Sequence, residues 1–476
     1  MLLFFSGILL IPLVLALFEP EPEASCFIES SAICAICGLL MYLPTCRCKM
    51  LFSTREGFFV VTMSWVALAI FGGLPYMLYR ENPLSFPDAF FETMSGFSTT
   101  GASILSDIEG MPRSLLLWRS FTHFLGGMGI IVLFLAILPA MGAGGFQLFR
   151  AEVPGPTKDK LSPKITNTAK MLWGVYVGLN LGCILCLVLV GMGPFDAINH
   201  SFAAIATGGF STKNTSVAAF HNWKVEIVLT IFMYLAGCNF LHFINILRGK
   251  IKPIFKNEEW RFYTCSILLA SAFIAIVNGY RNAEPHASPQ RLALDALFTV
   301  TTLTTCTGFG TVDVDSWPQV CQLVVLCMMI MGACAGSTGG GMKVFRVVIL
   351  LKSTIRDVAH MLHPRAILPL KMDGEHVQDD LLRMILGFVG LHLAVLGGFT
   401  LLLLCIEGDR FNILSIFSAC VTCLSGVGPG LDKFGTTDNF SALSDASKMA
   451  LSFLMLMGRL EIYSVLTFFS RKLWMR

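Results

Sequence analysis

The sequence predicts an all-α polytopic membrane protein: two N-terminal transmembrane helices, then four repeats of helix, pore helix, loop and helix. A pore helix here is a short helix that enters the membrane only part of the way. Three observations predict this fold class. Of the 476 residues, 55% are hydrophobic and only 14% are charged, too few charges for the surface of a soluble chain of this length. Apolar stretches of about twenty residues, enough to cross a bilayer as a helix, recur along the chain. Thr/Gly clusters recur between these stretches.

The apolar stretches give about ten transmembrane helices. The first, Met1–Phe18, lacks a basic start, and the acidic segment 19–23 follows it where a signal peptide would have small residues. We therefore expect it to be a retained span. The other long apolar stretches are Phe27–Leu43, Gly57–Tyr79, Phe121–Met141, Met171–Met192, Val225–Leu247, Phe262–Gly279, Met384–Ile406 and Ala446–Phe469.

The net charge of +3 conceals a strong asymmetry between alternate loops. Most of the 34 basic residues lie in the loops at 47–55, 150–170, 248–261, 343–383 and 471–476. Because positively charged loops stay inside, these loops and the C-terminus are predicted to be cytoplasmic. The opposite loops are net acidic and would concentrate cations at the outer face. The sixteen cysteines show no zinc-site spacing and are interpreted as small buried thiols.

Four outward segments share one pattern, in which a short amphipathic stretch leads into a Thr/Gly cluster. The stretches are Asp88–Ser98, Asp196–Ala206, Asp295–Thr305 and Asn412–Leu424, and the clusters are loop 1 (99–103), loop 2 (207–212), loop 3 (306–311) and loop 4 (425–430). A pattern that recurs four times along the chain indicates one supersecondary unit used four times. The predicted division is 1–50 for the two-helix extension, 51–150, 151–256 and 257–372 for the first three repeats, and 373–476 for the fourth.

The register of the first three units is regular. Asp88, Asp196 and Asp295 each lie 13 residues before a loop glycine, namely Gly101, Gly209 and Gly308. The fourth unit departs from this pattern, with Ser415 at the same distance before Gly428. We expect each aspartate to cap the start of its short helix, so that the negative helix C-terminus points inward and favours a cation.

The loops themselves are suited to a dehydrated cation. Irregular backbone survives at membrane depth only where it lines a water-filled path or is buried in protein. Glycine permits positive φ, which lets consecutive carbonyls turn toward one axis and replace a hydration shell, as in potassium-channel filters. The predicted filter residues, and the predicted K⁺ ligands, are Thr99, Thr100, Gly101, Thr207, Gly208, Gly209, Cys306, Thr307, Gly308, Gly426, Val427 and Gly428.

A second glycine cluster interrupts the apolar stretch that begins near Gln319. Four of the six residues at 336–341 are glycine, and each lowers helix stability by about 1 kcal/mol, so this part of the span should not be helical. We expect a gating loop beneath the filter, formed by Gly336, Ser337, Thr338, Gly339, Gly340 and Gly341, with Lys343 and Arg459 as further gate residues. A phosphate-binding P-loop is excluded by spacing, because Met342 separates the last glycine from Lys343.

Arg459 is a charge within the last apolar stretch, which makes it a candidate functional residue. Two interpretations stay open. It either hinders cation passage below the filter and touches the gating loop, or it is a structural clamp on backbone carbonyls. Glu461 is two residues away and therefore on another face of the helix, so the two are not an obvious ion pair.

The chain resembles the Trk/Ktr/HKT superfamily of potassium transporters, and within it the bacterial Trk membrane subunits. The resemblance covers essentially the whole chain. The matching stretches are 88–92 leading to 99–102, then 126–132, 151–156, 200–203, 208–212, 332–341, 428–431 and 458–461. It implies a multi-pass protein of the bacterial inner membrane, surrounded by lipid, with one potassium pore per subunit. It also implies a homodimer, and a cytoplasmic nucleotide-binding ring as regulatory subunit that acts on the gating loop. The nucleotide is expected on that partner, and no organic cofactor or nucleic acid is expected for this chain.

Two other classes of function were weighed. A membrane-embedded enzyme would need His/acid or Cys/His groups at catalytic spacing, and His123, His200, His242, His363 and His392 form none. A secondary transporter would need paired intramembrane acids, whereas the spans hold almost none besides Glu226 and Glu461. Gated passive conduction is therefore the preferred interpretation, and the chain is not expected to be an enzyme. The basic segments 150–170 and 343–383 are either solvated loops or a docking surface for the gating ring.

Overall fold

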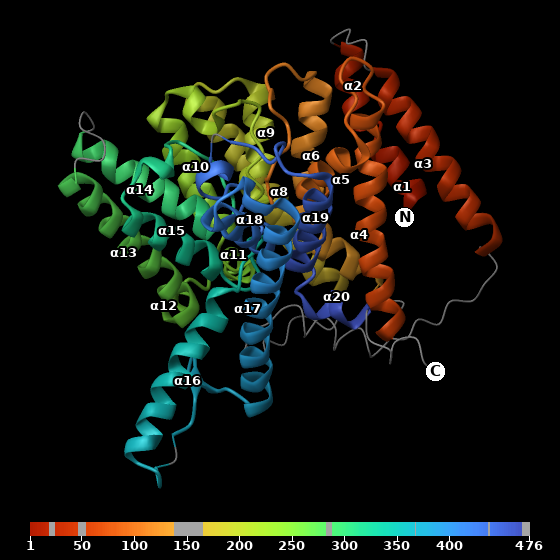
Figure 1. Cartoon of the computed structure of the whole chain (residues 1–476). Coiled ribbons are helices and arrows are strands. Elements are labelled where there is room, and N and C mark those ends of the chain that lie inside the picture. The colour runs from red at the N-terminus through yellow and green to blue at the C-terminus, as the bar shows by residue number, and fades with distance from the viewer. Residues whose placement is uncertain are drawn as a thin grey trace.

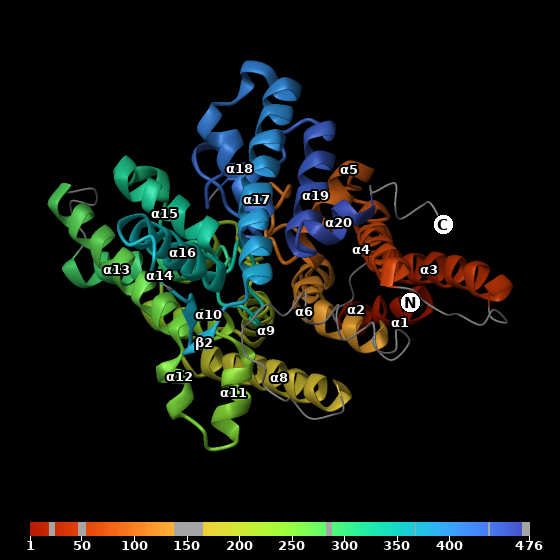
Figure 2. The same ribbon diagram turned by 90° about the horizontal axis from the view of Figure 1, so that it is seen from below.

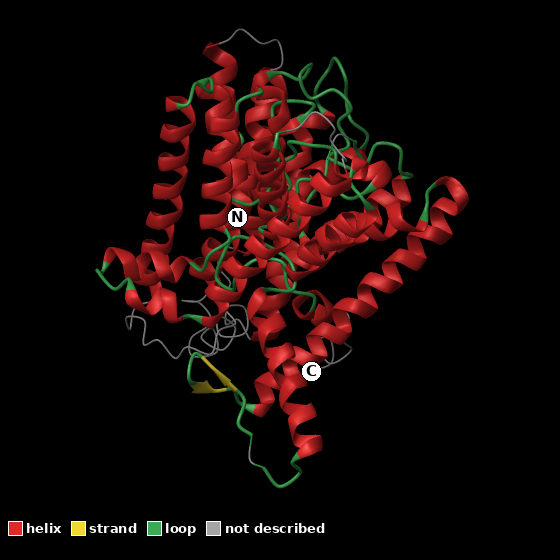
Figure 3. Ribbon diagram, turned by 90° about the vertical axis from the view of Figure 1, so that its left-hand side faces the viewer, coloured by secondary structure: helices red, strands yellow, loops and turns green. Residues whose placement is uncertain are grey.

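The computed structural model describes residues 1–18, 24–45, 54–137, 165–281, 288–366, 368–436 and 438–468. Within these residues the regular secondary structure is helical apart from one short hairpin, which Figure 3 draws in yellow. Figure 2 shows four groups of helices around a common centre, with α1 to α3 outside them beside α4. The predicted fold class, an all-α polytopic membrane protein, is thus confirmed.

The outer helices and pore helices of the four groups alternate along the chain (Figure 1). The first two groups contain α4 (Thr54–Met77), α5 (Phe86–Phe97) and α6 (Arg113–Ile137), then α8 (Ile165–Leu189), α9 (Pro194–Ile205), η2 (Ser216–Phe220), α10 (Trp223–Ala236) and α11 (Phe240–Leu247). The third contains α12 (Lys252–Lys256), α13 (Glu258–Arg281), α14 (Pro289–Thr304), η3 (Val314–Ser316), α15 (Gln319–Met331), α16 (Val344–Leu362), β1 (Lys371–Met372) and β2 (Glu375–His376). The fourth contains α17 (Asp379–Glu407), η4 (Gly408–Arg410), α18 (Ile413–Ser425), η5 (Asp432–Phe434), α19 (Asp445–Arg459) and α20 (Tyr463–Phe468).

Five helices among the described residues are long and apolar enough to cross a membrane. They are Ala24–Pro44, Phe59–Met77, Lys170–Leu189, Glu258–Arg281 and Asp379–Arg410. These agree with predicted spans. The parts of the predicted cytoplasmic loops at 46–53 and 138–164, the matching stretch 151–156 and the C-terminal residues 469–476 lie outside the described residues.

The N-terminal stretch Met1–Phe18 was predicted to be one span, which is wrong in detail. It forms two helices, α1 (Leu2–Ile8) and α2 (Ile11–Phe18), that precede α3 (Ala24–Thr45). Pro12 lies in the first turn of α2, where its missing N–H and its ring are tolerated, but it could not continue α1 without removing a backbone hydrogen bond.

The predicted single spans Val225–Leu247 and Ala446–Phe469 are also broken. The axes of α10 and α11 differ by 93°, and α19 is separated from α20 by 460–462. The bend follows Ala236, where Asn239 caps α11 by accepting a hydrogen bond from the Leu241 N–H at 2.9 Å. Polar residues, among them Asn239 and Glu461, lie at the two breaks, but the overall hydrophobicity of each stretch outweighs them in a prediction of spans.

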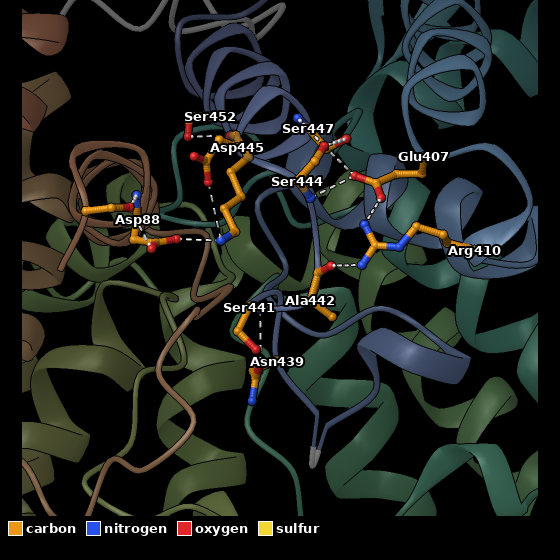
Figure 4. A network of polar contacts seen from close by, with 12 residues as sticks. Asp88, Glu407, Arg410, Asn439, Ser441, Ala442, Ser444, Asp445, Ser447 and Ser452 are labelled. Carbon is orange, nitrogen blue, oxygen red and sulfur yellow. Dashed lines mark hydrogen bonds and ion pairs between the residues drawn. The ribbon is translucent and has the colours of Figure 1, made fainter.

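Of the three aspartates that precede the loops, Asp88 and Asp196 lie in the first turn of their pore helices, as predicted for a carboxylate at the positive helix end, but none of the three is the N-cap residue. α5 begins two residues before Asp88, after the N-cap Ser85, and α14 begins at Pro289, so that Asp295 lies in mid-helix and pairs with Arg291 at 2.6 Å. Ser85 and proline at the first positions provide stronger start signals. Asp88, labelled in Figure 4, accepts a hydrogen bond from the hydroxyl of the N-cap Ser85 at 2.7 Å. It also forms an ion pair with Lys448 of α19 at 2.6 Å, which joins the first and fourth groups.

Glycines of the inner helices allow the pore helices to pack closely against them. A Cβ on Gly126 of α6 would overlap the carbonyl oxygen of Phe97, the last residue of α5. A Cβ on Gly458 of α19 would overlap the carbonyl oxygen of Leu424 in α18. Both contacts lie where a pore helix ends, so each inner helix fixes the depth at which its loop begins.

The first prediction concerns this packing. Gly126→Ala should lower the stability of the folded protein by about 1–3 kcal/mol, because the added methyl group overpacks the contact with Phe97. Gly178→Ala in α8 is the matched control, since a Cβ there has nothing within 4 Å, and helix propensity alone should make it neutral or stabilising. Thermal unfolding in detergent checks this. Equal melting temperatures for the two variants would contradict the packing argument.

Candidate functional site

The four Thr/Gly loops have the same backbone conformation. One residue just after each pore helix has positive φ: 55° at Thr99, 55° at Thr207 and 61° at Cys306, each the second residue after its helix, and 71° at Gly426, which directly follows α18. Two residues later φ is positive again: 86° at Gly101, 78° at Gly209, 86° at Gly308 and 101° at Gly428. Three of the first four residues are not glycine, and a non-glycine residue in this region is strained by about 1–2 kcal/mol. Such strain persists where the surrounding structure enforces it.

The pore helices also end in the same way. The N–H groups of Thr100, Gly208, Thr307 and Val427 each donate to the carbonyl five residues earlier, at 2.9, 2.7, 2.8 and 3.0 Å. Of the two hydrogen bonds of the Schellman motif, this is the one that spans more residues. The motif satisfies the C-terminal carbonyls of a helix when a left-handed residue ends it. Each motif turns the chain sharply away from its helix and begins the loop at the same point in all four groups.

The loops close on one another in a ring. A Cβ on Gly101, Gly209 or Gly308 would overlap the carbonyl oxygen of Gly208, Thr307 or Val427, respectively, in the next loop. A Cβ on Gly428 would lie 2.8 Å from the carbonyl oxygen of Thr100, which closes the ring from loop 4 to loop 1. Each of these carbonyls precedes the ring glycine of its own loop. The twelve predicted filter residues therefore lie in four mutually contacting loops at the centre of the molecule.

Side-chain hydroxyls are paired within loops 1 and 3. Ser98 and Thr100 share a hydrogen bond of 2.7 Å, and Thr305 and Thr307 share one of 2.8 Å. All four residues are buried. The helix dipoles of α5, α9, α14 and α18 direct partial negative charge to the ring, and carbonyl oxygens at this depth are ligands suited to a cation without its water.

The predicted interruption of the third inner helix is present. α15 ends at Met331 and α16 begins at Val344, and the residues between them form the segment 332–343. This segment lies against the ends of three pore helices. The Gly341 N–H donates to the Ser425 carbonyl at 2.8 Å, and the Thr338 hydroxyl donates to the Ile205 carbonyl at 2.9 Å. A Cβ on Gly339 would lie 2.7 Å from the Thr305 carbonyl.

The segment 332–343 also satisfies the backbone groups left free where the second inner helix breaks. The Cys334 N–H donates to the Gly237 carbonyl at 3.1 Å, and the Phe240 N–H donates to the Gly336 carbonyl at 3.0 Å. The buried Glu259 of α13 accepts a hydrogen bond from the Ala335 N–H at 2.6 Å. Irregular backbone at this depth is tolerated because the two breaks pair with each other.

The two cationic gate candidates lie at this segment. The Lys343 ammonium donates to the Gly339 carbonyl. Arg459 donates to the Thr338 carbonyl at 3.2 Å and to the Gly126 carbonyl of α6 at 2.7 Å. Arg459 thus joins the segment 332–343 to the first inner helix. Glu461 pairs instead with Arg346 of α16 at 2.6 Å.

Sequence reasoning missed three buried groups next to the loops. Glu92 of α5 and Arg119 and His123 of α6 are each at most 2% exposed and contact loops 1 and 2. A charged residue within an apolar region is a recognisable signal. Arg119 precedes the predicted span Phe121–Met141 by two residues, so the predicted bounds leave it outside the span.

These features define a class: polytopic membrane proteins in which four backbone loops meet at one axis, an arrangement suited to cation transport.

Comparisons with known proteins agree with this class. The family model described as "TrkH: Cation transport protein" matches residues 24–475. The Trk system potassium uptake protein TrkH of Escherichia coli K12 is 35% identical over 476 residues, covering 100% of this chain and 97% of that protein. TrkG of the same organism is 35% identical over 478 residues, covering 99% and 96%. The crystal structure of the potassium transporter TrkH from Vibrio parahaemolyticus superposes with a TM-score of 0.88 at 33% identity, covering 100% and 97%.

The chain therefore belongs to the TrkH family of cation transport proteins. This assignment confirms the resemblance predicted from the motifs, and it confirms a multi-pass membrane transport protein rather than an enzyme.

Proposed function

We propose that this chain carries potassium into the cell across the bacterial inner membrane, through one pore whose filter is formed by loops 1 to 4. The observation that carries the proposal is the ring of contacts, in which the glycine of each loop lies against a backbone carbonyl of the next loop around the ring. In such a ring the backbone oxygens are the ligands nearest the axis. Backbone oxygens can replace the hydration shell of a potassium ion. The names of the relatives, which are potassium uptake proteins, support potassium as the ion.

The four loops and their flanking helices are proposed to be four copies of one unit, at 51–150, 151–256, 257–372 and 373–476, after a two-helix extension at 1–50. Their shared helix ends and shared φ values support this division. The excess of basic residues in alternate loops supports a cytoplasmic C-terminus.

The segment 332–343 is proposed to be the gate. Its contacts with the ends of α9, α14 and α18 support a position across the path directly below the filter. In this proposal Arg459 holds the segment in place, Lys343 stabilises its conformation through the bond to Gly339 within it, and opening requires these bonds to be exchanged. The two donor bonds of Arg459 to backbone carbonyls favour the clamp interpretation over that of a barrier to cations.

A cytoplasmic nucleotide-binding subunit is proposed to control this gate in a homodimeric assembly. The relatives are named as members of a Trk system, which supports a regulatory partner. A contact path to the gate supports the site of its action. In the turn between β1 and β2, Asp373 accepts hydrogen bonds from the Asn257 amide at 2.8 Å and from the Glu258 N–H at 2.7 Å. The next residue of α13 is Glu259, which holds Ala335, so a pull on the hairpin would reach the gate.

The second prediction tests the filter. Gly209→Ser should abolish most potassium-limited growth and rubidium uptake in cells that lack their own potassium importers, because the side chain would overlap the Thr307 carbonyl. Gly101→Ser and Gly428→Ser should act alike. Gly191→Ser is the matched control, since Gly191 has the same left-handed conformation, with φ of 99°, but nothing within 4 Å of a Cβ. If correctly inserted wild-type protein gave no rescue with its regulatory partner present, the cation-pore proposal would be wrong.

The third prediction tests the gate. Glu259→Ala removes the acceptor of the Ala335 N–H and should raise uptake in the absence of the regulatory partner by about tenfold, the equivalent of losing one hydrogen bond to a charged group. Glu258→Ala is the control, because Glu258 pairs with Lys352 and not with the segment 332–343. Rubidium uptake into proteoliposomes measures both. Unchanged partner-free uptake in folded Glu259→Ala protein would contradict the proposed hold on the gate.

A further inference from the structure

A buried ion pair lies behind loops 1 and 2. Glu92 of α5 and Arg119 of α6 have side chains that are 0% and 3% exposed, and the Arg119 Nε donates to Glu92 Oε1 at 2.6 Å. A buried pair of this kind is maintained only when the remaining polar atoms also find partners. Those partners identify what the pair holds.

Glu92 holds loop 1. The Ser103 hydroxyl contacts both carboxylate oxygens, at 3.0 and 3.1 Å, and the Ile104 N–H donates to Oε2 at 2.9 Å. Ser103 lies two residues after the ring glycine Gly101. The carboxylate therefore fixes the outer half of loop 1 directly after its contact with loop 2.

Arg119 holds the equivalent position of loop 2. Its Nη1 donates to the Ser211 carbonyl at 2.8 Å, and Ser211 lies two residues after the ring glycine Gly209. Its guanidinium carbon lies 3.7 Å from the centroid of the Phe210 ring. One carboxylate–guanidinium pair thus links the same position of two neighbouring loops.

His123, one turn further along α6, extends this contact. Its Nδ1 lies 2.8 Å from the Gly96 carbonyl, and the Phe210 N–H donates to its Nε2 at 3.3 Å. This pattern fits a neutral imidazole with the proton on Nδ1. Its ring stacks on Phe210 at 4.1 Å between centroids.

Loops 3 and 4 are held by hydroxyl groups at related positions. The Phe309 N–H donates to the Thr302 hydroxyl at 2.8 Å, and the Leu431 N–H donates to the Ser418 hydroxyl at 3.0 Å. Neutral hydrogen bonds are about half as strong as charge-assisted ones. The Glu92–Arg119 pair therefore gives loops 1 and 2 charge-assisted contacts two or three residues after their ring glycines, where the contacts just described for loops 3 and 4 are neutral.

We infer that the Glu92–Arg119 pair is a specificity-determining element of this transporter, which sets the spacing of loops 1 and 2 and so the preference of the filter for potassium over sodium. The inference rests on the proposed function. Both residues are positioning residues, because they contact the loops from behind and act through them. Loop backbones held in strained conformations require such support from their surroundings. Selectivity between the two ions depends on how the backbone carbonyls are arranged around the ion, so a change in the spacing of the loops should change the selectivity.

The test is the permeability ratio of potassium to sodium, measured from the reversal potential of the full chain in liposomes. This ratio does not depend on how much protein is active. Glu92→Gln keeps the side-chain shape but weakens the pair, and it should lower the ratio about tenfold, as expected for one charge-assisted bond. The matched control is Glu226→Gln. Glu226 is also buried and forms an ion pair with Arg291 at 2.7 Å, and weakening that pair should leave the ratio unchanged.

Ser103→Ala provides a second variant, which removes one contact of Glu92 without leaving an unpaired charge, and it should lower the ratio to a smaller extent. It decides the inference if Glu92→Gln does not fold. If the wild-type protein selects potassium and the folded Glu92→Gln or Ser103→Ala variant has the same permeability ratio, the inference is overturned and the proposed function stays intact. A wild-type protein that conducts no cation would overturn the proposed function and the inference with it.

Discussion

The structure depends on the contact between the ring glycine of one loop and the backbone carbonyl of its neighbour. A Cβ at Gly101, Gly209 or Gly308 would overlap that oxygen, so the four loops approach to a distance that no other residue permits. The pore helices and inner helices around the ring make this close approach possible. The pore helices end in the same motif, and Gly126 and Gly458 of the inner helices let two of them reach the depth at which the ring forms. The left-handed residues Thr99, Thr207 and Cys306, which precede the ring glycines of loops 1 to 3, are strained and need support from the surrounding structure.

Irregular backbone within a membrane must find partners in the protein, and here the interrupted elements supply them to one another. The break after α10 and the segment 332–343 exchange hydrogen bonds, and the same segment reaches the ends of three pore helices. A change in one interruption therefore alters the other. This coupling gives a physical basis for the proposed gate. The segment 332–343 has no regular structure of its own, and among the bonds that hold it to the rest of the protein are those from Glu259 and Arg459.

Much of this architecture could be predicted from the sequence, because the spacing of glycines is a direct record of backbone conformation. The loops and the interruption at 336–341 were predicted in this way, and most spans were predicted from the length of their apolar stretches. The bend after Ala236 was not predicted, because Val225–Leu247 is apolar over most of its length and only Gly237 and Asn239 mark the break. The supposed capping role of Asp295 was wrong, since proline and serine set the start of α14. Glu92, Arg119 and His123 were missed because their meeting depends on the packing of α5 against α6.

The central claim is that the ring of loop carbonyls binds the transported ion. Anomalous diffraction from crystals of the full chain, grown with rubidium in place of potassium, tests it most directly. The account predicts a rubidium peak on the axis between the carbonyl oxygens of Thr100, Gly208, Thr307 and Val427, and loss of that peak in Gly209→Ser crystals. A rubidium peak bound elsewhere, with none at the ring in protein that transports rubidium, would contradict it.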